Sequence, residues 1–190
     1  MIDFAMSLED GLAKLAQAHE QSLKDLQKVG VRLDSNPPVV LVDGKATYYD
    51  GRIPSDLTTL SNNNLGLYLG LLAEWKSHLN NQLSVAQRCA KNAEIKMKFV
   101  RDRLRISFNG QEGLAAGDKT ARINIDKRFL EQQSEFIRWD AFVKYLRPLV
   151  DTAEGNYAAI SRRISQISNE LDAFNRGRNV GGIPNYGALK

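Results

Sequence analysis

Cysteine, histidine and proline are scarce in this 190-residue chain, which has one cysteine, two histidines and five prolines. The single cysteine excludes an internal disulfide. His19 and His78 fall on different expected helices and have no neighbouring ligand residue, so the sequence offers neither a metal site nor a nucleophilic dyad. We therefore expect no catalytic residues, no metal, no cofactor and no enzymatic activity.

Long apolar runs are also missing. No stretch of about 20 apolar residues occurs, which excludes a membrane-spanning helix and a membrane partner of that kind. The first residues lack the basic and apolar regions of a secretory signal. Together with the lone Cys89, these absences favour the reducing environment of a cytoplasm.

Local patterns predict a helix and a β-hairpin in the N-terminal segment. Ser7 followed by Asp10 is typical of a helix N-cap, and leucines then recur at helical spacing up to Gly30, a typical helix stop. Further on, the β-prone stretches 39–42 and 45–49 flank an Asp-Gly pair, which favours a tight hairpin turn.

Two apolar seams with alternating three- and four-residue spacing predict a long helical hairpin. The first seam, on a helix expected over about 62–107 and capped by Ser55 or Ser61, comprises Leu72, Leu79, Leu83, Ala86, Ala90, Ala93, Met97, Val100 and Leu104. The second comprises Ile125, Phe129, Phe136, Trp139, Val143, Leu146, Val150, Ala153, Tyr157, Ile160, Ile164, Ile167, Leu171 and Phe174. Two such seams joined by a short loop must fold back on each other, because each otherwise stays exposed. We expect Pro148 to kink the second helix and Gly177 to end it.

A glycine-rich stretch over 107–117 separates the two seams, and we interpret it as a turn. The residues from Gly113 to Thr120 approach a phosphate-loop motif. However, only three residues separate the two glycines, and Asp118 precedes the lysine where a phosphate would lie. The sequence therefore favours a plain turn, in which Asp118 or Thr120 caps the next helix.

The predicted fold class is all-α for the most part. A long antiparallel helical hairpin or coiled coil carries an extra N-terminal helix and a small β-hairpin. We expect three segments: residues 1–54 as the N-terminal appendage, 55–176 as the hairpin, and 177–190 as a flexible C-terminal tail.

Basic residues are concentrated near the end of the first long helix. Residues 61–105 contain eight basic and three acidic residues, whereas residues 1–60 contain six and nine. The concentrated group comprises Arg88, Lys91, Lys96, Lys98, Arg101, Arg103 and Arg105. Such a stripe can follow a phosphate backbone, and Phe99 and Phe108 are placed to stack on unpaired bases. The alternative is a solvated helix face without a nucleic-acid partner.

Several short patterns over residues 62–178 carry a family resemblance. They are Tyr68, Trp75 and Lys76; Val100-Arg101-Asp102-Arg103-Leu104 followed by Ser107-Phe108-Asn109-Gly110; Tyr157–Ile164; and Phe174–Gly177. In these patterns the chain resembles the phage recombination mediator family (UvsY-like).

The resemblance implies a homo-oligomeric, single-stranded DNA-binding mediator. Such a protein would help displace single-strand-binding protein and load a RecA-like recombinase, in the host cytoplasm if a phage encodes it. Arg101 and Arg103 would then contact phosphates, with Lys96 and Lys98 in support. The alternative function is a non-enzymatic structural or adaptor coiled-coil protein, such as a virion or secretion component, that acts through protein–protein contacts.

Overall fold

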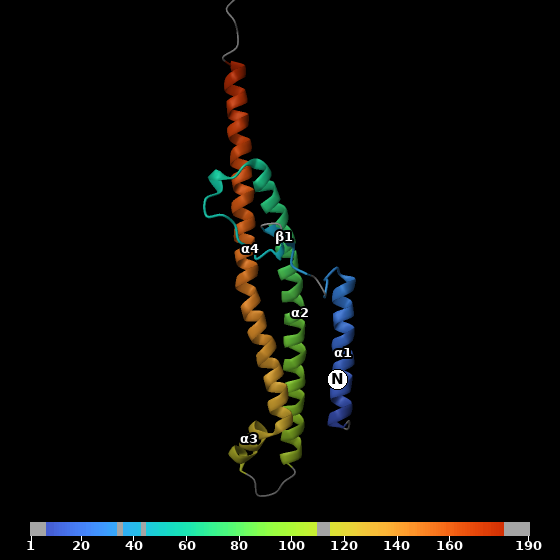
Figure 1. Cartoon of the computed structure of the whole chain (residues 1–190). Helices are drawn as coiled ribbons and strands as arrows, with labels where there is room; N and C mark the ends of the chain where they lie inside the picture. The colour runs from blue at the N-terminus through green and yellow to red at the C-terminus, as the bar shows by residue number, and fades with distance from the viewer. Residues whose placement is uncertain (1–6, 34–35, 43–44, 110–114, 181–190) are drawn as a thin grey trace, which may run out of the picture. The chain divides into compact units, whose positions relative to one another are not determined.

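The computed structural model describes residues 7–33, 36–42, 45–109 and 115–180. In this part of the chain the helices are α1 (Leu8–Lys28), α2 (Asn62–Asn109), α3 (Ala116–Ile125) and α4 (Lys127–Val180), with a short 3-10 helix at Leu57–Thr59. Strands β1 (Val39–Val42) and β2 (Lys45–Tyr48) pair in an antiparallel sheet. Figure 1 follows these elements along the chain by colour. The predicted fold class is confirmed: the protein is mostly helical, with a long pair of packed helices and a small β-hairpin.

Helix α1 begins and ends as its sequence predicts. The backbone N–H of Asp10 donates to Ser7 Oγ over 3.1 Å, which is the expected N-cap contact. At the other end Gly30 has a φ of +94°, and its N–H donates to the carbonyl of Gln27. This left-handed conformation favours glycine and ends the helix.

The β-hairpin also has the predicted register. Val42 pairs with Lys45 and Val39 with Tyr48, so two residues separate the strands. The Asp43-Gly44 pair that predicted the turn lies outside the described residues. The polypeptide then reaches α2, where the N–H of Asn64 donates to Ser61 Oγ over 3.3 Å. Of the two serines proposed as caps, Ser61 therefore fills that role.

The described residues belong to two compact units. Unit 1 lies within residues 1–36 and 77–150, and unit 2 within residues 37–76 and 151–190. Each unit therefore combines two stretches that are distant in sequence, whereas the predicted segments 1–54, 55–176 and 177–190 follow the order of the chain. Each unit has its own hydrophobic core.

The core of unit 1 joins α2, α3 and α4, and α1 packs on it. The buried residues of this core cluster are Val100, Leu104, Ile123 and Phe129, with Leu8, Leu12, Met97 and Phe108 packed around them. Helix α1 approaches α2 closely at Gly11, where a Cβ atom would lie only 2.2 Å from Cζ of Phe99. Glycine at this position thus allows α1 to lie directly on the Phe99 ring.

The core of unit 2 lies next to the β-hairpin, which contributes Val40 to it, and it includes Trp75 and three tyrosines. Its buried members are Tyr49, Leu65, Leu72 and Ile160. The Trp75 and Tyr49 rings meet edge to face, with centroids 6.5 Å apart, and Tyr49 Oη donates to the carbonyl of Arg52 over 2.8 Å. Burial raises the pKa of Tyr49 to about 12, and nearby Tyr68 and Asp50 add to the effect.

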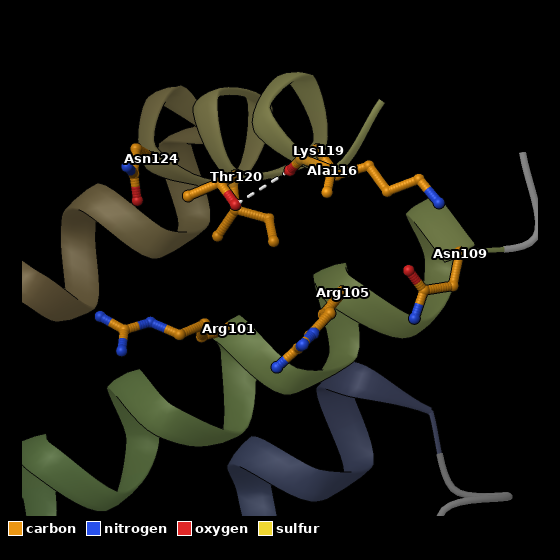
Figure 2. A pocket seen from close by; sticks show the side chains of 8 residues that line it. Arg101, Arg105, Asn109, Ala116, Lys119, Thr120 and Asn124 are labelled. Carbon is orange, nitrogen blue, oxygen red and sulfur yellow. Dashed lines mark hydrogen bonds between the residues drawn. The ribbon is translucent and has the colours of Figure 1, made fainter. Parts of the chain in front are cut away.

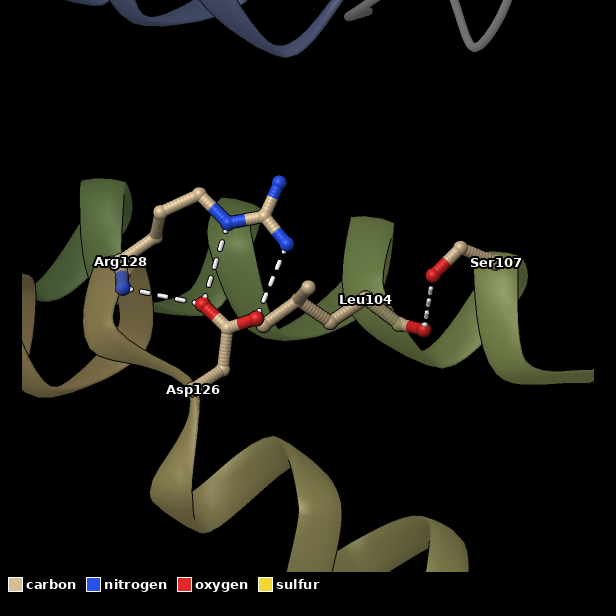
Figure 3. A network of polar contacts seen from close by, with 4 residues as sticks. All are labelled: Leu104, Ser107, Asp126 and Arg128. Atoms are coloured by element: carbon tan, nitrogen blue, oxygen red, sulfur yellow. Dashed lines mark hydrogen bonds and ion pairs between the residues drawn. The ribbon is translucent and has the colours of Figure 1, made fainter.

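The second helical segment differs from the prediction, because it consists of two helices. Gly117 lies inside α3, and Ala115 is the N-cap without any side-chain hydrogen bond, so the expected caps Asp118 and Thr120 are wrong. The two helices separate at Asp126 (Figure 3). Its carboxylate accepts from the backbone N–H of Arg128 over 2.9 Å and from the Arg128 guanidinium, which lowers the pKa of Asp126. Asp126 thus starts α4.

The ends of the second seam also depart from the prediction. Ile125 is 75 % exposed and Ile123 is buried instead, while Leu171 and Phe174 are exposed. Helix α4 continues past Gly177 to Val180, so the predicted stop is wrong by one turn. It also continues through Pro148, and residues 181–190 of the predicted tail lie outside the described residues.

Candidate nucleic-acid interface

The basic residues of α2 differ in exposure. Arg88, Lys91, Lys98, Arg101 and Arg105 are exposed, whereas Lys96 and Arg103 are half-buried. All seven lie in unit 1. The predicted stripe therefore has five members that a phosphate can approach directly and two whose side chains also take part in packing.

Glu94 lies among these cations and pairs with two of them. Its carboxylate contacts Lys91 Nζ at 2.8 Å and Lys98 Nζ one turn further along α2. Hydrogen bonds from these two lysines lower the pKa of Glu94 to about 2, so it is ionised at neutral pH. The positive charge of the middle of the stripe is thus partly compensated within the helix itself.

Two arginines of the stripe lie over aromatic rings. The Arg101 guanidinium carbon is 5.1 Å from the centroid of the Phe129 ring, and that of Arg103 is 5.6 Å from the Phe99 ring. A cation over an aromatic face gains about 0.5–1 kcal/mol at exposed sites. Because Phe129 is 1 % exposed and fixed in the core of unit 1, its ring restricts where Arg101 can lie.

A polar pocket lies between the last turns of α2 and helix α3 (Figure 2). It has a volume of about 570 Å³ and is lined by Arg101, Arg105, Asn109, Ala116, Lys119, Thr120, Ile123 and Asn124. In Figure 2, Thr120 and Asn124 project from α3 toward α2, across the pocket from the two arginines. Three cationic side chains therefore line one hollow, with Arg101 at the end near Asn124, Lys119 at the end near Asn109 and Arg105 between them (Figure 2), and none of the described residues that line it is acidic.

Of the two predicted base-stacking residues, Phe99 is not free to stack, and the role of Phe108 stays a prediction. Phe99 is 8 % exposed and is covered by α1 at Gly11, so its predicted role is wrong. Phe108 is half-buried and packs against the core of unit 1. The geometry of this region is therefore suited to contacts with phosphates more than to aromatic contacts with bases.

Sequence reasoning missed the α3 half of the pocket. The glycines before Lys119 and Thr120 favour a turn with Thr120 as a possible helix cap, and no pattern in the sequence marks Lys119 or Asn124 as part of a site. The spacing of Ala116, Thr120 and Ile123 is that of one helix face and was the available signal.

The remaining reactive groups form a contact between α1 and α2. His19 Nε2 lies 3.8 Å from Cys89 Sγ. Burial lowers the pKa of His19, with Lys96 contributing, and burial raises the pKa of Cys89. Both groups are thus held in their uncharged forms, which are poorly suited to nucleophilic chemistry. Within the described residues, no three His, Cys, Asp or Glu side chains are arranged to hold a metal ion.

Two further observations bear on classification. None of the helices in the described ranges is long and apolar enough to cross a lipid bilayer. Comparison with protein-family models, curated proteins and solved structures gives no match. The resemblance to recombination mediators therefore stays a prediction.

Proposed function

We propose that this protein binds single-stranded DNA through the basic residues at the end of α2. The observation that supports this most is that Arg101, Arg105 and Lys119 line one pocket that has no acidic residue among its described lining. Cationic side chains bind a phosphate backbone by releasing its condensed counterions, which requires no particular sequence. The other exposed members of the stripe extend the same positive surface along α2.

A single strand suits this surface better than a duplex. Sequence reading in duplex DNA needs a helix or ribbon that enters a groove with several side chains facing base edges. Here the exposed cations surround a pocket, and α3 lies beside it. A flexible single strand can direct one phosphate into such a hollow, whereas the phosphates of a stiff duplex are held on its cylindrical surface.

On this basis we propose a role as a recombination mediator. The protein would load a RecA-like recombinase and help displace single-strand-binding protein, as the sequence resemblance implies. Each protomer offers few phosphate contacts, so several copies on one strand would supply the affinity. Homo-oligomerisation is therefore part of the proposal.

Binding of a fluorescent single-stranded oligonucleotide at several salt concentrations tests the proposal. Replacing Arg101 and Arg105 by Ala should weaken binding roughly 10- to 100-fold and reduce the salt slope by about 1.4, because two phosphate contacts are lost. The matched control removes two exposed arginines of unit 2, Arg162→Ala with Arg176→Ala, and should change affinity less than about 2-fold. Equal losses in both double variants, or no binding by the wild type at low salt, would refute the proposal.

One observation supports self-assembly, which the mediator and the alternative of a structural or adaptor protein share. Leu130, Ile137 and Tyr145 on α4 are 43 %, 58 % and 65 % exposed, and their spacing places them on one helix face. An apolar stripe of this kind fits a contact with a second copy of the chain. Mass measurement in solution checks this: Ile137→Glu should lower the oligomer mass, and Ile125→Glu, at an exposed site on α3, should not.

If the wild type assembles without any affinity for oligonucleotides, the adaptor function takes the place of the mediator. If it is a monomer with and without DNA, homo-oligomerisation is wrong for both functions.

A further inference from the structure

The cations of the pocket between α2 and α3 have no acidic partner among the described residues, unlike several nearby lysines. Lys91 and Lys98 pair with Glu94, and Lys127 lies 3.9 Å from Glu131. No such ion pair joins Arg101, Arg105 or Lys119 to the described part of the chain. The pocket thus collects positive charge that the surrounding protein leaves uncompensated.

Three like charges around one hollow repel one another, and an anion at its centre removes that cost. The pocket also offers neutral groups that donate to an anion's oxygens, namely the amides of Asn109 and Asn124, whereas the hydroxyl of Thr120 donates to the carbonyl of Ala116 over 3.2 Å (Figure 2). Ala116, the first residue of α3, lines the same space, so the positive end of the α3 dipole adds to the field. These donors match the oxygens of a phosphate group.

We propose that this pocket is a phosphate-binding site, in which Arg101 and Arg105 of α2 and Lys119 of α3 hold one phosphate group between them. The assignment of that phosphate to a nucleic acid rests on the proposed function. It adds α3 to the interface, although the basic stripe of the sequence lies on α2 alone. The phosphate is an internal phosphodiester or the terminal phosphate of a strand.

The position of the Arg101 side chain is restricted in the protein without a ligand. Its guanidinium lies over the Phe129 ring, and Phe129 and Ile123 belong to the same buried core cluster. The arginine and helix α3 are therefore attached to a common core, which reduces the motion lost when a phosphate binds. Binding should also stabilise α3 against unfolding, since the ligand joins the two helices.

The test compares two lysine or arginine removals on the same helix. Lys119→Ala removes a cation that lines the pocket, and Arg122→Ala removes an exposed cation of α3 that does not. We expect Lys119→Ala to weaken oligonucleotide binding about 5- to 10-fold and to reduce the salt slope by about 0.7, and Arg122→Ala to weaken it less than 2-fold. Equal losses in the two variants would overturn the site, because they would reflect net charge and not the pocket.

Two oligonucleotides distinguish the sources of the phosphate. If Lys119→Ala weakens binding of a strand with a 5′-hydroxyl as much as that of the 5′-phosphorylated strand, the pocket takes an internal phosphate. If the loss is confined to the 5′-phosphorylated strand, it takes the terminal one. Circular dichroism of each variant checks that α3 remains folded, and Lys119→Gln replaces Lys119→Ala if the alanine variant loses helix.

Inorganic pyrophosphate separates this proposal from the proposed function. Its binding, followed by calorimetry at low salt, should be measurable for the wild type and lost in Lys119→Ala. If the protein binds pyrophosphate but does not bind oligonucleotides, DNA binding is refuted and the phosphate site is supported. Oligonucleotide binding that Lys119→Ala leaves unchanged would keep the proposed function and refute the site.

Discussion

The two units of this protein differ in net charge. Unit 1 contains 18 basic and 14 acidic residues, whereas unit 2 contains eight of each, so the net charge of +4 belongs entirely to unit 1. Both cores are mainly aliphatic: that of unit 1 includes Phe129 and Phe108, and that of unit 2 includes three tyrosines and Trp75 next to a β-hairpin. A nearly uniform helical architecture therefore presents one positive unit and one neutral unit.

Both units rely on a glycine beneath an aromatic ring, but in different ways. In unit 1, Gly11 is helical and lets α1 approach Phe99. In unit 2, Gly51 has a φ of +82°, faces Trp75, and its carbonyl accepts a hydrogen bond of 3.0 Å from Asn156. Gly51 thus combines a left-handed backbone with a close tertiary contact, whereas Gly11 has the close contact alone.

The largest expected effect follows from Gly51. A Cβ at this position would lie 2.3 Å from Nε1 of Trp75 and would also force a strained φ. We expect Gly51→Ala to lower the free energy of unfolding by about 3 kcal/mol. Gly30→Ala is the matched control, because its φ is +94° with no atom within 4 Å of a Cβ, and it should cost about 1 kcal/mol. Chemical denaturation of the two variants measures the difference.

If Gly51→Ala and Gly30→Ala cost the same, the contact with Trp75 contributes nothing and the comparison of the two glycines fails. Oligonucleotide affinity of folded Gly51→Ala should equal that of the wild type, since unit 2 contains none of the proposed phosphate contacts.

The second prediction separates packing from binding within unit 1. Phe129→Leu and Phe99→Leu each remove a buried ring and should each lower stability by about 1–2 kcal/mol. Only Phe129 supports Arg101, which lines the pocket. We expect Phe129→Leu to weaken oligonucleotide binding about 2- to 5-fold through loss of the cation–π contact, and Phe99→Leu to leave it unchanged. A loss of affinity in Phe99→Leu alone would reverse the assigned roles of the two rings.

The third prediction concerns the pH dependence of unit 1. Burial is the main cause that lowers the pKa of His19, Lys96 and Arg88 also lower it, and Glu135 raises it. The folded protein thus binds a proton at His19 less readily than the unfolded chain does. The contribution of neutral His19 to the free energy of unfolding is therefore fully present above pH 6.5, and it is lost as the pH decreases below that value. His19→Gln should remove this part of the decrease, which melting curves between pH 8 and pH 5 would detect. An unchanged pH dependence in His19→Gln would assign it to other groups.

Local sequence signals predicted the elements whose causes are local. The Ser7 cap, the Gly30 stop and the two-residue hairpin connection follow from contacts within a few residues, and the alternating spacing of α2 follows from one apolar face. Six of the nine predicted seam residues of α2 are buried, which is enough to identify the face that packs on α4.

The features that were missed depend on contacts between distant segments. Phe99 and Cys89 lie off the predicted seam, yet both are buried because α1 covers a second side of α2 at Gly11 and His19. The apolar spacing within α2 does not indicate that α1 packs on a second side of it. The boundary between α3 and α4 at Asp126 was missed for another reason. No glycine or proline lies next to this capping aspartate, so in the sequence it resembles any aspartate within a helix.

The same limits apply to the candidate site. The cations of α2 were visible as a cluster in the sequence, but their different environments were not. Arg103 lies over a buried ring, whereas Arg105 lines a pocket that only the presence of α3 creates. Charge content is a property of composition, and a pocket is a property of tertiary structure.

The smallest expected effect is a gain of affinity, and it tests whether the charge of unit 1 acts through specific residues. Glu94 holds Lys91 and Lys98 in ion pairs, and with a pKa of about 2 it remains charged in any ordinary binding buffer. Glu94→Gln should free both lysines and strengthen oligonucleotide binding about 2- to 3-fold. Asp140→Asn removes one negative charge from unit 1 beside Lys144 on α4 and should have no effect. Equal gains would mean that overall charge, and not the stripe on α2, attracts the strand.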